Sequence, residues 1–181
     1  MTPTGERAGH DDDAVEHEVT SGPEPVVRVA GPDDVAAICA FGEAHIRPHY
    51  EPLIGAEAAD EQVRTWWNEA AISGAVARGV VVVAETGGQV VGVGQRGRSG
   101  SDHVVYKLYV HPQQRGRGLG PRLLAALVGH LPADAARLYI EHFAANERAG
   151  AFYEREGFRV ERIEPGPTGE LDVVWRVREL R

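Results

Sequence analysis

The segment Gln113–Gly120, with the sequence Gln-Gln-Arg-Gly-Arg-Gly-Leu-Gly, limits the choice of folds more than any other part of the chain. It follows a Val- and Tyr-rich run at 103–110 and precedes a run with leucines at helical spacing from Leu119 to Leu131. Glycines let the backbone approach a ligand, and the free N–H groups in the first turn of a helix attract phosphate. The segment therefore predicts a strand-turn-helix unit that binds phosphate, or a glycine turn that only starts a helix.

Two known phosphate motifs do not fit this segment. No Gly-Lys-Ser/Thr sequence ends the turn, as a P-loop requires. The glycines at 116, 118 and 120 also have the wrong spacing for the dinucleotide fingerprint G-x-G-x-x-G.

Alternating and β-branched runs predict about seven strands. A tight turn at Gly87-Gly88 joins two of these runs and predicts a hairpin, and a Gly/Ser/Arg loop is expected at 97–101 before the next strand. A turn is expected at 165–169 before the last strand. The expected strands are 26–29, 80–85, 89–95, 103–110, 138–143, 158–163 and 171–177.

Helical spacing of apolar residues predicts about four helices, at 32–48, 57–73, 119–131 and 147–156. The first is expected to end at Pro48, which also disrupts the helical spacing of His45 and His49 as metal ligands. We assign no metal site. The order of elements has no internal repeat and predicts one α/β domain, with a mixed sheet flanked by helices.

The net charge of −8 is concentrated at the start of the chain. Residues 1–25 hold seven acidic residues and one basic residue, which leaves a net charge of −2 for the remainder. The first 25 residues contain few large apolar side chains, so we interpret them as a disordered acidic tail before a domain at 26–181. No basic stripe points to nucleic acid as a partner.

The single cysteine, Cys39, lies among apolar residues at helical spacing and is expected to be a buried small hydrophobe in a reducing compartment. No apolar run is long enough for a membrane span, and no secretory signal is recognised. These features predict a cytoplasmic protein without a membrane partner; a homodimer is left open.

Two motifs in this sequence resemble those of the GNAT acetyltransferase superfamily. Gln113, Gly116 and Gly118 are similar to its acetyl-CoA signature Q/R-x-x-G-x-G/A, and the preceding run 108–112 is similar to its fourth strand. The segment 146–158 resembles N-x-x-A-x-x-F-Y-x-x-x-G-F. The resemblance covers about residues 26 to 178. It implies the GNAT fold, with a mostly antiparallel sheet whose fourth and fifth strands splay apart.

The resemblance implies acetyl-CoA as co-substrate. Its pantetheine arm would fill the gap between the splayed strands, and the Val110 N–H would face the acetyl carbonyl as an oxyanion donor. The pyrophosphate would rest on amides of the glycine turn, and Asn146 would contact the arm or cap the helix that follows it. The cofactor-binding residues so implied are Leu108, Tyr109, Val110, Gln113, Arg115, Gly116, Arg117, Gly118, Leu119, Gly120 and Asn146.

The resemblance also implies two catalytic residues. Tyr153 matches the tyrosine that commonly protonates the leaving thiolate; the alternative is an aromatic packing residue. Glu141 resembles the glutamate that ribosomal-protein N-terminal acetyltransferases of this superfamily use as base; the alternative is a structural carboxylate. His142 is a weaker candidate, because adjacent strand residues face opposite sides.

These features predict an N-acetyltransferase that transfers acetyl to a primary amine, either a small molecule or a protein N-terminus, by direct attack in a ternary complex. In this superfamily the first two helices and their connection, here His45 to Glu57, largely form the acceptor site. The alternatives are a non-catalytic acyl-CoA-binding regulatory domain and a phosphate-binding module for another nucleotide. The sequence leaves the acceptor open.

Overall fold

A single seven-stranded sheet forms the centre of the computed structural model, which describes residues 23–166 and 171–180. The strand order is β1-β2-β3-β4-β5-β7-β6, and every neighbouring pair is antiparallel except β4 and β5, which are parallel. The predicted mixed, mostly antiparallel sheet is confirmed. The strands are β1 (Val26–Val29), β2 (Val81–Thr86), β3 (Gln89–Ser99), β4 (Asp102–Val110), β5 (Arg137–Phe143), β6 (Arg159–Pro165) and β7 (Asp172–Glu179).

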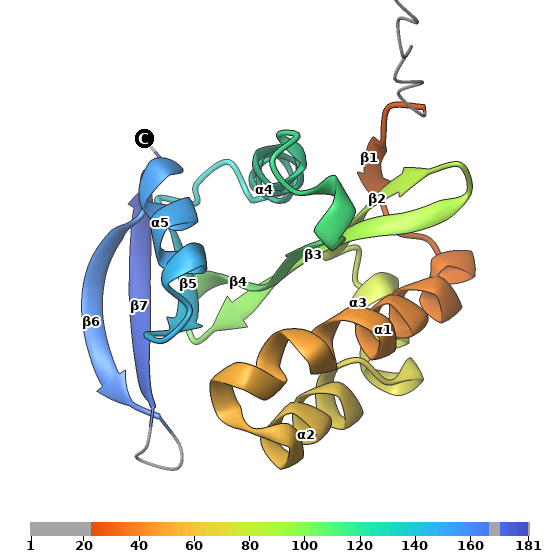
Figure 1. Ribbon diagram of the computed structural model, residues 1–181. Helices are drawn as coiled ribbons and strands as arrows, with labels where there is room; N and C mark the ends of the chain where they lie inside the picture. Colours follow the sequence, from red (N-terminus) through yellow and green to blue (C-terminus); the bar gives the residue numbers. More distant parts are fainter. Residues whose placement is uncertain (1–22, 167–170, 181) are drawn as a thin grey trace, which may run out of the picture.

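Helices cover both faces of the sheet (Figure 1). On one face lie α1 (Val35–Ile54), α2 (Ala56–Trp66) and α3 (Glu69–Ala77); on the other lie α4 (Leu119–Gly129) and α5 (Glu147–Arg155). Short 3₁₀ turns occupy Pro32–Asp34 and Pro112–Gln114. No helix in the described ranges is both long enough and apolar enough to cross a membrane.

The predicted end of the first helix is wrong. Instead of stopping at Pro48, α1 continues through Pro48 and Pro52 to Ile54, so most of the segment 45–57 is helical rather than a connecting loop. Both prolines are exposed. Each proline lacks the N–H that would donate to the carbonyl one turn earlier, and on the exposed side of the helix water can donate to that carbonyl instead.

The helix expected at 57–73 is two helices, so the described chain has five α-helices rather than about four. The break comes at Trp67, whose side chain is 4% exposed and packs into the core. Asn68 then starts α3 by accepting a hydrogen bond from the Ala71 N–H at 2.9 Å. A buried tryptophan and a new N-cap therefore interrupt an otherwise continuous helical pattern.

One connection also differs from expectation. The loop expected at 97–101 is mainly strand, because β3 continues to Ser99 and the turn lies at 100–101. Gly97 suits this strand, since a Cβ there would lie 2.7 Å from the Tyr106 ring. Most of the turn expected at 165–169 and most of the tail lie outside the described residues. Pro23 and Glu24, assigned to the tail, are described and bond to Thr86 and Arg122.

β4 and β5 splay apart, as predicted. Their pairing extends only from His103↔Leu138 to Val105↔Ile140. At the same point the register of β4 with β3 shifts, so that Tyr106 has no partner on β3. Such a β-bulge bends a strand and ends pairing. It leaves residues 106–110 without a partner strand on the β5 side.

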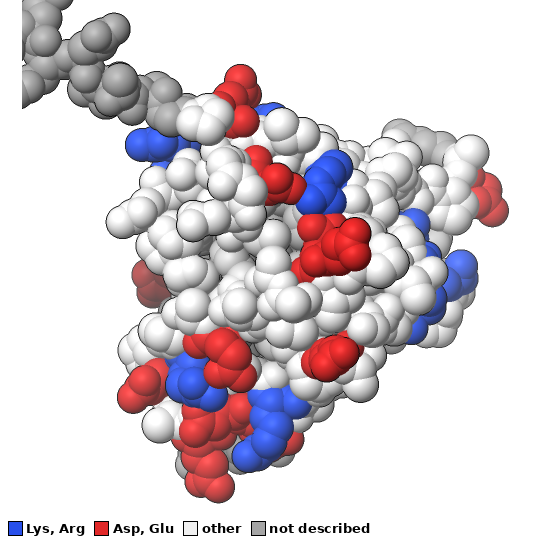
Figure 2. All heavy atoms as spheres, turned by 90° about the vertical axis from the view of Figure 1, so that its right-hand side faces the viewer, with Lys and Arg blue, Asp and Glu red and all other residues white. Residues whose placement is uncertain are grey.

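The core has two main parts, one on each face of the sheet. One lies beneath α1–α3 and includes Ile38, Phe41 and Trp67; the other lies beneath α4 and α5 and includes Leu123, Tyr153 and Phe158. On the face drawn in Figure 2, acidic and basic side chains are interspersed, in keeping with the small net charge after residue 25.

Packing of α1 against Trp67 makes Gly42 sensitive to substitution. A Cβ at Gly42 would lie 2.7 Å from Trp67, whereas at Gly74 in α3 it would meet only the end of the flexible Arg78 side chain, at 3.4 Å. We expect Gly42→Ala to destabilise the fold by about 1–3 kcal/mol through overpacking. Gly74→Ala is expected to be neutral or stabilising by up to about 1 kcal/mol, because alanine favours a helix. Urea unfolding of both variants tests this; equal effects would contradict it.

Candidate active site

The gap between β4 and β5 presents backbone groups that have no protein partner strand. The His111 N–H donates to the Val91 carbonyl of β3 at 2.8 Å. Since neighbouring residues of a strand turn their backbone groups to opposite sides, the N–H and C=O of Val110 and Leu108 face the gap, and those of Tyr109 face β3. An extended ligand with amide groups can therefore pair with β4 as an added strand would.

The glycine turn lies at the carboxyl end of β4 and opens α4. Gly116 and Gly118 have φ values of 76° and 75°, a region that favours glycine. A Cβ at either glycine would meet no atom within 4 Å. Within the described ranges, no protein group accepts a hydrogen bond from the N–H groups of residues 116–120. Unpartnered amides at the start of a helix can bind an anion.

Leu119 and Gly120 contribute to this site through the backbone only. The Leu119 side chain is 3% exposed and packs in the core beneath α4. A Cβ on Gly120 would lie 3.1 Å from the Phe152 ring, so this glycine allows α4 to pack closely on α5.

The structure favours a shifted reading of the Q/R-x-x-G-x-G pattern. The sequence fits the pattern from Gln113, and equally from Arg115 with Gly118 and Gly120. Gln113 is an exposed residue of the 3₁₀ turn, whereas Gly118 is the N-cap of α4 and Gly120 lies in its first turn. The second register places all its positions at the start of the helix.

Cationic side chains surround the turn. The Arg115 Nε donates to the Val110 carbonyl at 3.0 Å, and the pKa of Arg115 is lowered, first by burial and then by the nearby charge of Arg148. In the described part of the chain, no acidic side chain pairs with Arg115, Arg117 or Arg148. An anion bound here would relieve the repulsion between these cations.

Sequence reasoning missed Arg148. It lies in the first turn of α5, where the helix dipole disfavours a cation. This position was the signal available in the sequence. A cation in the first turn destabilises the helix but can stabilise a bound anion.

Asn146 has the capping role predicted for it, and its contact with the cofactor arm stays a prediction. Its Oδ1 caps α5 by accepting from the Ala149 N–H at 3.2 Å, and its Nδ2 lies 3.4 Å from the Nε2 of His49 on α1. Helix α1 thus reaches across the gap to α5. Burial, followed by Arg115 and Arg148, lowers the pKa of His49, which favours the neutral imidazole.

His45 and His49 of α1 do not form a metal-binding group with other described residues. The His45 ring lies 4.5 Å from that of His111, and burial, followed by the charge of His111, lowers the pKa of His45. Among the described residues, no group of three His, Cys, Asp or Glu side chains could hold a metal ion.

Tyr153 lies on the buried side of α5, with 6% of its surface exposed. Its ring stacks on His142 at 6.1 Å and meets Phe158 edge-on at 5.7 Å. Burial, followed by the proximity of Tyr50, raises the pKa of Tyr153, so the phenol stays protonated at neutral pH. A protonated phenol is the form that can donate a proton.

Glu141 and His142 face opposite sides of β5, as predicted. His142 lies on the α5 side, where its Nε2 accepts from Arg176 at 3.1 Å and its Nδ1 is 2.9 Å from the Phe143 carbonyl. Both nitrogens are engaged, so His142 is poorly suited to be a base. The exposed residue Glu141 lies on the other side, where its charge helps to raise the pKa of Tyr50. Partial burial of its carboxyl, followed by the charge of Glu164, raises the pKa of Glu141.

Two further tyrosines meet at the gap and were not identified as a pair from sequence. The hydroxyls of Tyr50, on α1, and Tyr109, on β4, hydrogen-bond to each other. The Tyr50 ring also contacts Phe143 at the end of β5, at 5.8 Å. No spacing rule could join residues so far apart in the chain, because only the path of α1 brings them together.

Comparisons with known proteins agree with this geometry. Residues 77–160 match the family model of the acetyltransferase (GNAT) domain. Among curated proteins, no sequence matches the chain.

Several solved structures share the fold. The PaiA N-acetyltransferase of Thermoplasma acidophilum, in complex with coenzyme A, is 13% identical, with a TM-score of 0.77 over 87% of this chain and 99% of that one. YncA of Salmonella typhimurium, a putative acetyltransferase with its cofactor acetyl-CoA, is 23% identical, with a TM-score of 0.64 over 88% and 95%. The ribosomal-protein-S18-alanine N-acetyltransferase of Escherichia coli is 21% identical, with a TM-score of 0.58 over 86% and 94%.

The family match covers β4, β5, the glycine turn, α4 and α5, but not α1, and the likeness of fold extends to most of the described chain. Residues 77–160 thus match the GNAT acetyltransferase domain, and the described chain has the fold of these solved acetyltransferases.

Proposed function

We propose that this protein transfers the acetyl group of acetyl-CoA to a primary amine by direct attack within a ternary complex. One observation carries the proposal: the gap lined by outward-facing backbone groups of Leu108 and Val110 ends at the unpartnered amides of residues 116–120. This arrangement fits an extended arm of amides followed by a pyrophosphate. The related structures with coenzyme A and acetyl-CoA support the choice of ligand.

In this proposal the cofactor-binding residues act in two groups. Leu108 and Val110 hydrogen-bond the pantetheine arm, and the Val110 N–H stabilises the charge that develops on the acetyl oxygen. The amides of residues 116–120 bind the pyrophosphate, with Arg115 and Arg148 supplying positive charge.

The two catalytic side chains approach the gap from opposite layers. Tyr153 lies in the α5 layer, where it would protonate the departing thiolate. Glu141 faces the α1–α3 layer, where it would take a proton from the amine, directly or through water. An amine that enters from the α1 side would then reach the thioester with Glu141 on its own side of the sheet and Tyr153 on the opposite side.

Two measurements test the proposal in sequence. Calorimetry with acetyl-CoA and with other nucleotides separates an acyl-CoA protein from a module for another phosphate ligand. A panel of amines with release of the CoA thiol as readout then separates the enzyme from an acyl-CoA-binding regulatory domain. Binding of acetyl-CoA without turnover of any amine would favour the regulatory domain.

Gly118→Val is expected to abolish stabilisation by CoA, because its side chain would occupy the space beside the proposed pyrophosphate. Gly100→Val is the matched control, since Gly100 also has a positive φ of 60° with open space around its Cβ, in the β3–β4 turn. At a CoA concentration of about 100 Kd, wild type and Gly100→Val should gain about 2.7 kcal/mol of stability. Thermal melts with and without CoA measure the gain; a normal gain in folded Gly118→Val would remove the turn from the site.

Tyr153→Phe removes one hydroxyl and retains the ring that packs on His142 and Phe158. If the hydroxyl is the general acid, the rate of acetyl transfer should fall by about 10²–10⁴. Affinity for acetyl-CoA should change little, because proton donation stabilises the transition state rather than the bound ligand. Rapid-quench measurement of the transfer step checks this even where product release limits turnover. An unchanged step would leave Tyr153 as a packing residue.

Glu141→Gln should lower the rate most at the lowest pH at which the Glu141 carboxylate is still ionised, because the amine is then largely protonated and a base matters most. Because the pKa of Glu141 is raised, wild-type activity should itself fall as pH drops through that pKa and the carboxylate becomes protonated. Acetyl-CoA binding, measured by calorimetry at each pH, serves as the control and should not change. Equal pH profiles for the two proteins would exclude Glu141 as the base.

A further inference from the structure

The chain has one lysine, Lys107, and it is buried beside the proposed site, with 6% of its surface exposed. It lies on β4 between the bulge at Tyr106 and the residues that line the gap. Its Nζ donates to Oε1 of Gln95 at 2.7 Å and lies 5.4 Å from the centre of the Trp67 ring. Lys107 is therefore held on the α1–α3 face of the sheet, the side from which the proposed acceptor enters.

The Lys107 ammonium has unfilled hydrogen-bonding capacity. An ammonium has three N–H donors, and the Gln95 side chain accepts one of them. In the described part of the chain, no carboxylate forms an ion pair with Lys107. Burial lowers the pKa of Lys107 to about 8, so the cation predominates at neutral pH. A buried cation without an anion is costly, and a bound anion would remove that cost.

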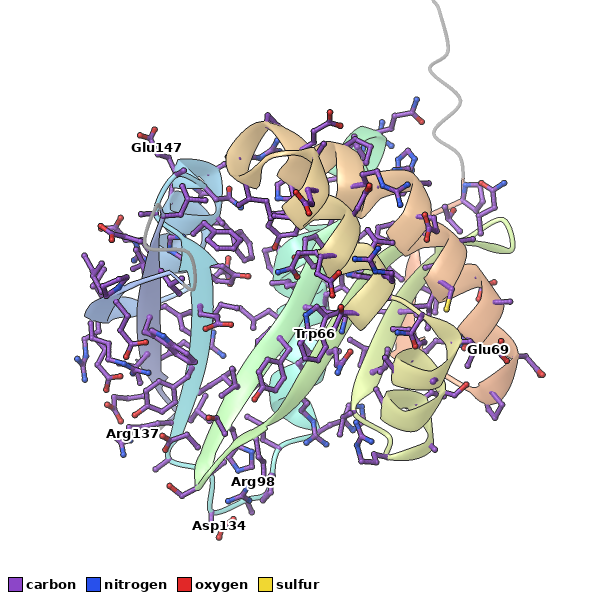
Figure 3. The ribbon with its side chains drawn as sticks, turned by 90° about the horizontal axis from the view of Figure 1, so that it is seen from below. Trp66, Glu69, Arg98, Asp134, Arg137 and Glu147 are labelled. Carbon is purple, nitrogen blue, oxygen red and sulfur yellow. The ribbon has the colours of Figure 1, made fainter. Side chains whose placement is uncertain are left out.

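A second donor lies beside this lysine. Of the two hydroxyl protons of Tyr50 and Tyr109, their mutual hydrogen bond uses one and leaves the other. Trp67 connects the two groups, because its ring lies near the Lys107 ammonium and 5.5 Å from the Tyr109 ring. In the view from below, the neighbouring Trp66 at the end of α2 is drawn over the sheet, and 54% of its surface is exposed (Figure 3). Lys107 and Tyr109 thus both lie against Trp67, on the α1–α3 face of the sheet.

From this arrangement we propose that Lys107 and the Tyr50–Tyr109 pair bind a carboxylate on the acceptor, so that the substrate is an amine of amino-acid type. The inference rests on the proposed acetyl transfer and narrows its substrate class. Glu141 stands on β5, on the same face of the sheet, and would receive the amine end. The two ends of a zwitterionic acceptor then meet charges of opposite sign.

Matched sets of acceptors test the proposal: free amino acids, their primary carboxamides and the corresponding amines without a carboxylate. Wild type should prefer the free carboxylates. Lys107→Gln retains a hydrogen-bonding group for Gln95 but removes the charge, and should lower kcat/KM for carboxylates by about ten- to hundredfold while carboxamides change little. Lys107→Met serves as a second, apolar variant. Normal stabilisation of each variant by CoA shows that it is folded.

A binding measurement reads the same subsite without turnover. In the presence of CoA, N-acetylated amino acids should bind wild type more tightly than their amides, and Lys107→Gln should lose the difference. Peptide acceptors that carry an Asp or Glu at the first, second or third position test whether the subsite binds a side-chain carboxylate instead of the α-carboxylate of a free amino acid. A preference for these peptides over free amino acids would overturn the proposed substrate class.

The outcomes also separate this inference from the proposed function. Turnover of amines with no preference for carboxylates, or an equal loss on carboxylates and carboxamides in Lys107→Gln, would overturn the carboxylate subsite and leave acetyl transfer intact. Tight binding of acetyl-CoA without turnover of any amine would instead contradict the proposed function.

Discussion

The β-bulge at Tyr106 is the constraint on which the rest of the site depends. Side chains alternate between the two faces of a strand, so Val105 and Lys107 would share a face in a regular β4. The extra residue breaks this alternation: Val105 packs beneath α4, and Lys107 meets Trp67 on the opposite face. The same residue ends the pairing of β4 with β5 and exposes the backbone of 108–110. One inserted position thus opens the gap and changes which side chains border it.

Much of the fold follows from local sequence signals. The hairpin at Gly87-Gly88 and the leucine stripe of α4 are encoded within short windows, and both are present. The family motifs add the mostly antiparallel pairing and the splay of the fourth and fifth strands, which no periodicity contains. The bulge is invisible in the sequence, because the run 103–110 is rich in valine and tyrosine throughout and nothing in it marks Tyr106 as unpaired.

The errors share a physical cause, since each depends on contacts between segments far apart in the chain. Pro48 stops an isolated helix, but α1 continues because Ile46 and Tyr50 on either side of it pack into the core. The pattern at 57–73 suits a helix, but the burial of Trp67 between α1 and the sheet breaks it. The pairing of Tyr50 with Tyr109 and the position of Arg148 beside Arg115 likewise arise only from the tertiary fold.

The described sheet has two parts, β1–β4 and β5–β7, which share only a short stretch of strand pairing, from His103↔Leu138 to Val105↔Ile140. At the open end of the gap, α1 contacts the second part and the helix packed on it: Tyr50 contacts Phe143, and His49 contacts Asn146. The core beneath α4 and α5 also joins the two parts, since Leu138 and Ile140 of β5 pack with Val105 of β4. A ligand that hydrogen-bonds to both sides of the gap would add to these contacts and would reduce motion between the two parts of the sheet.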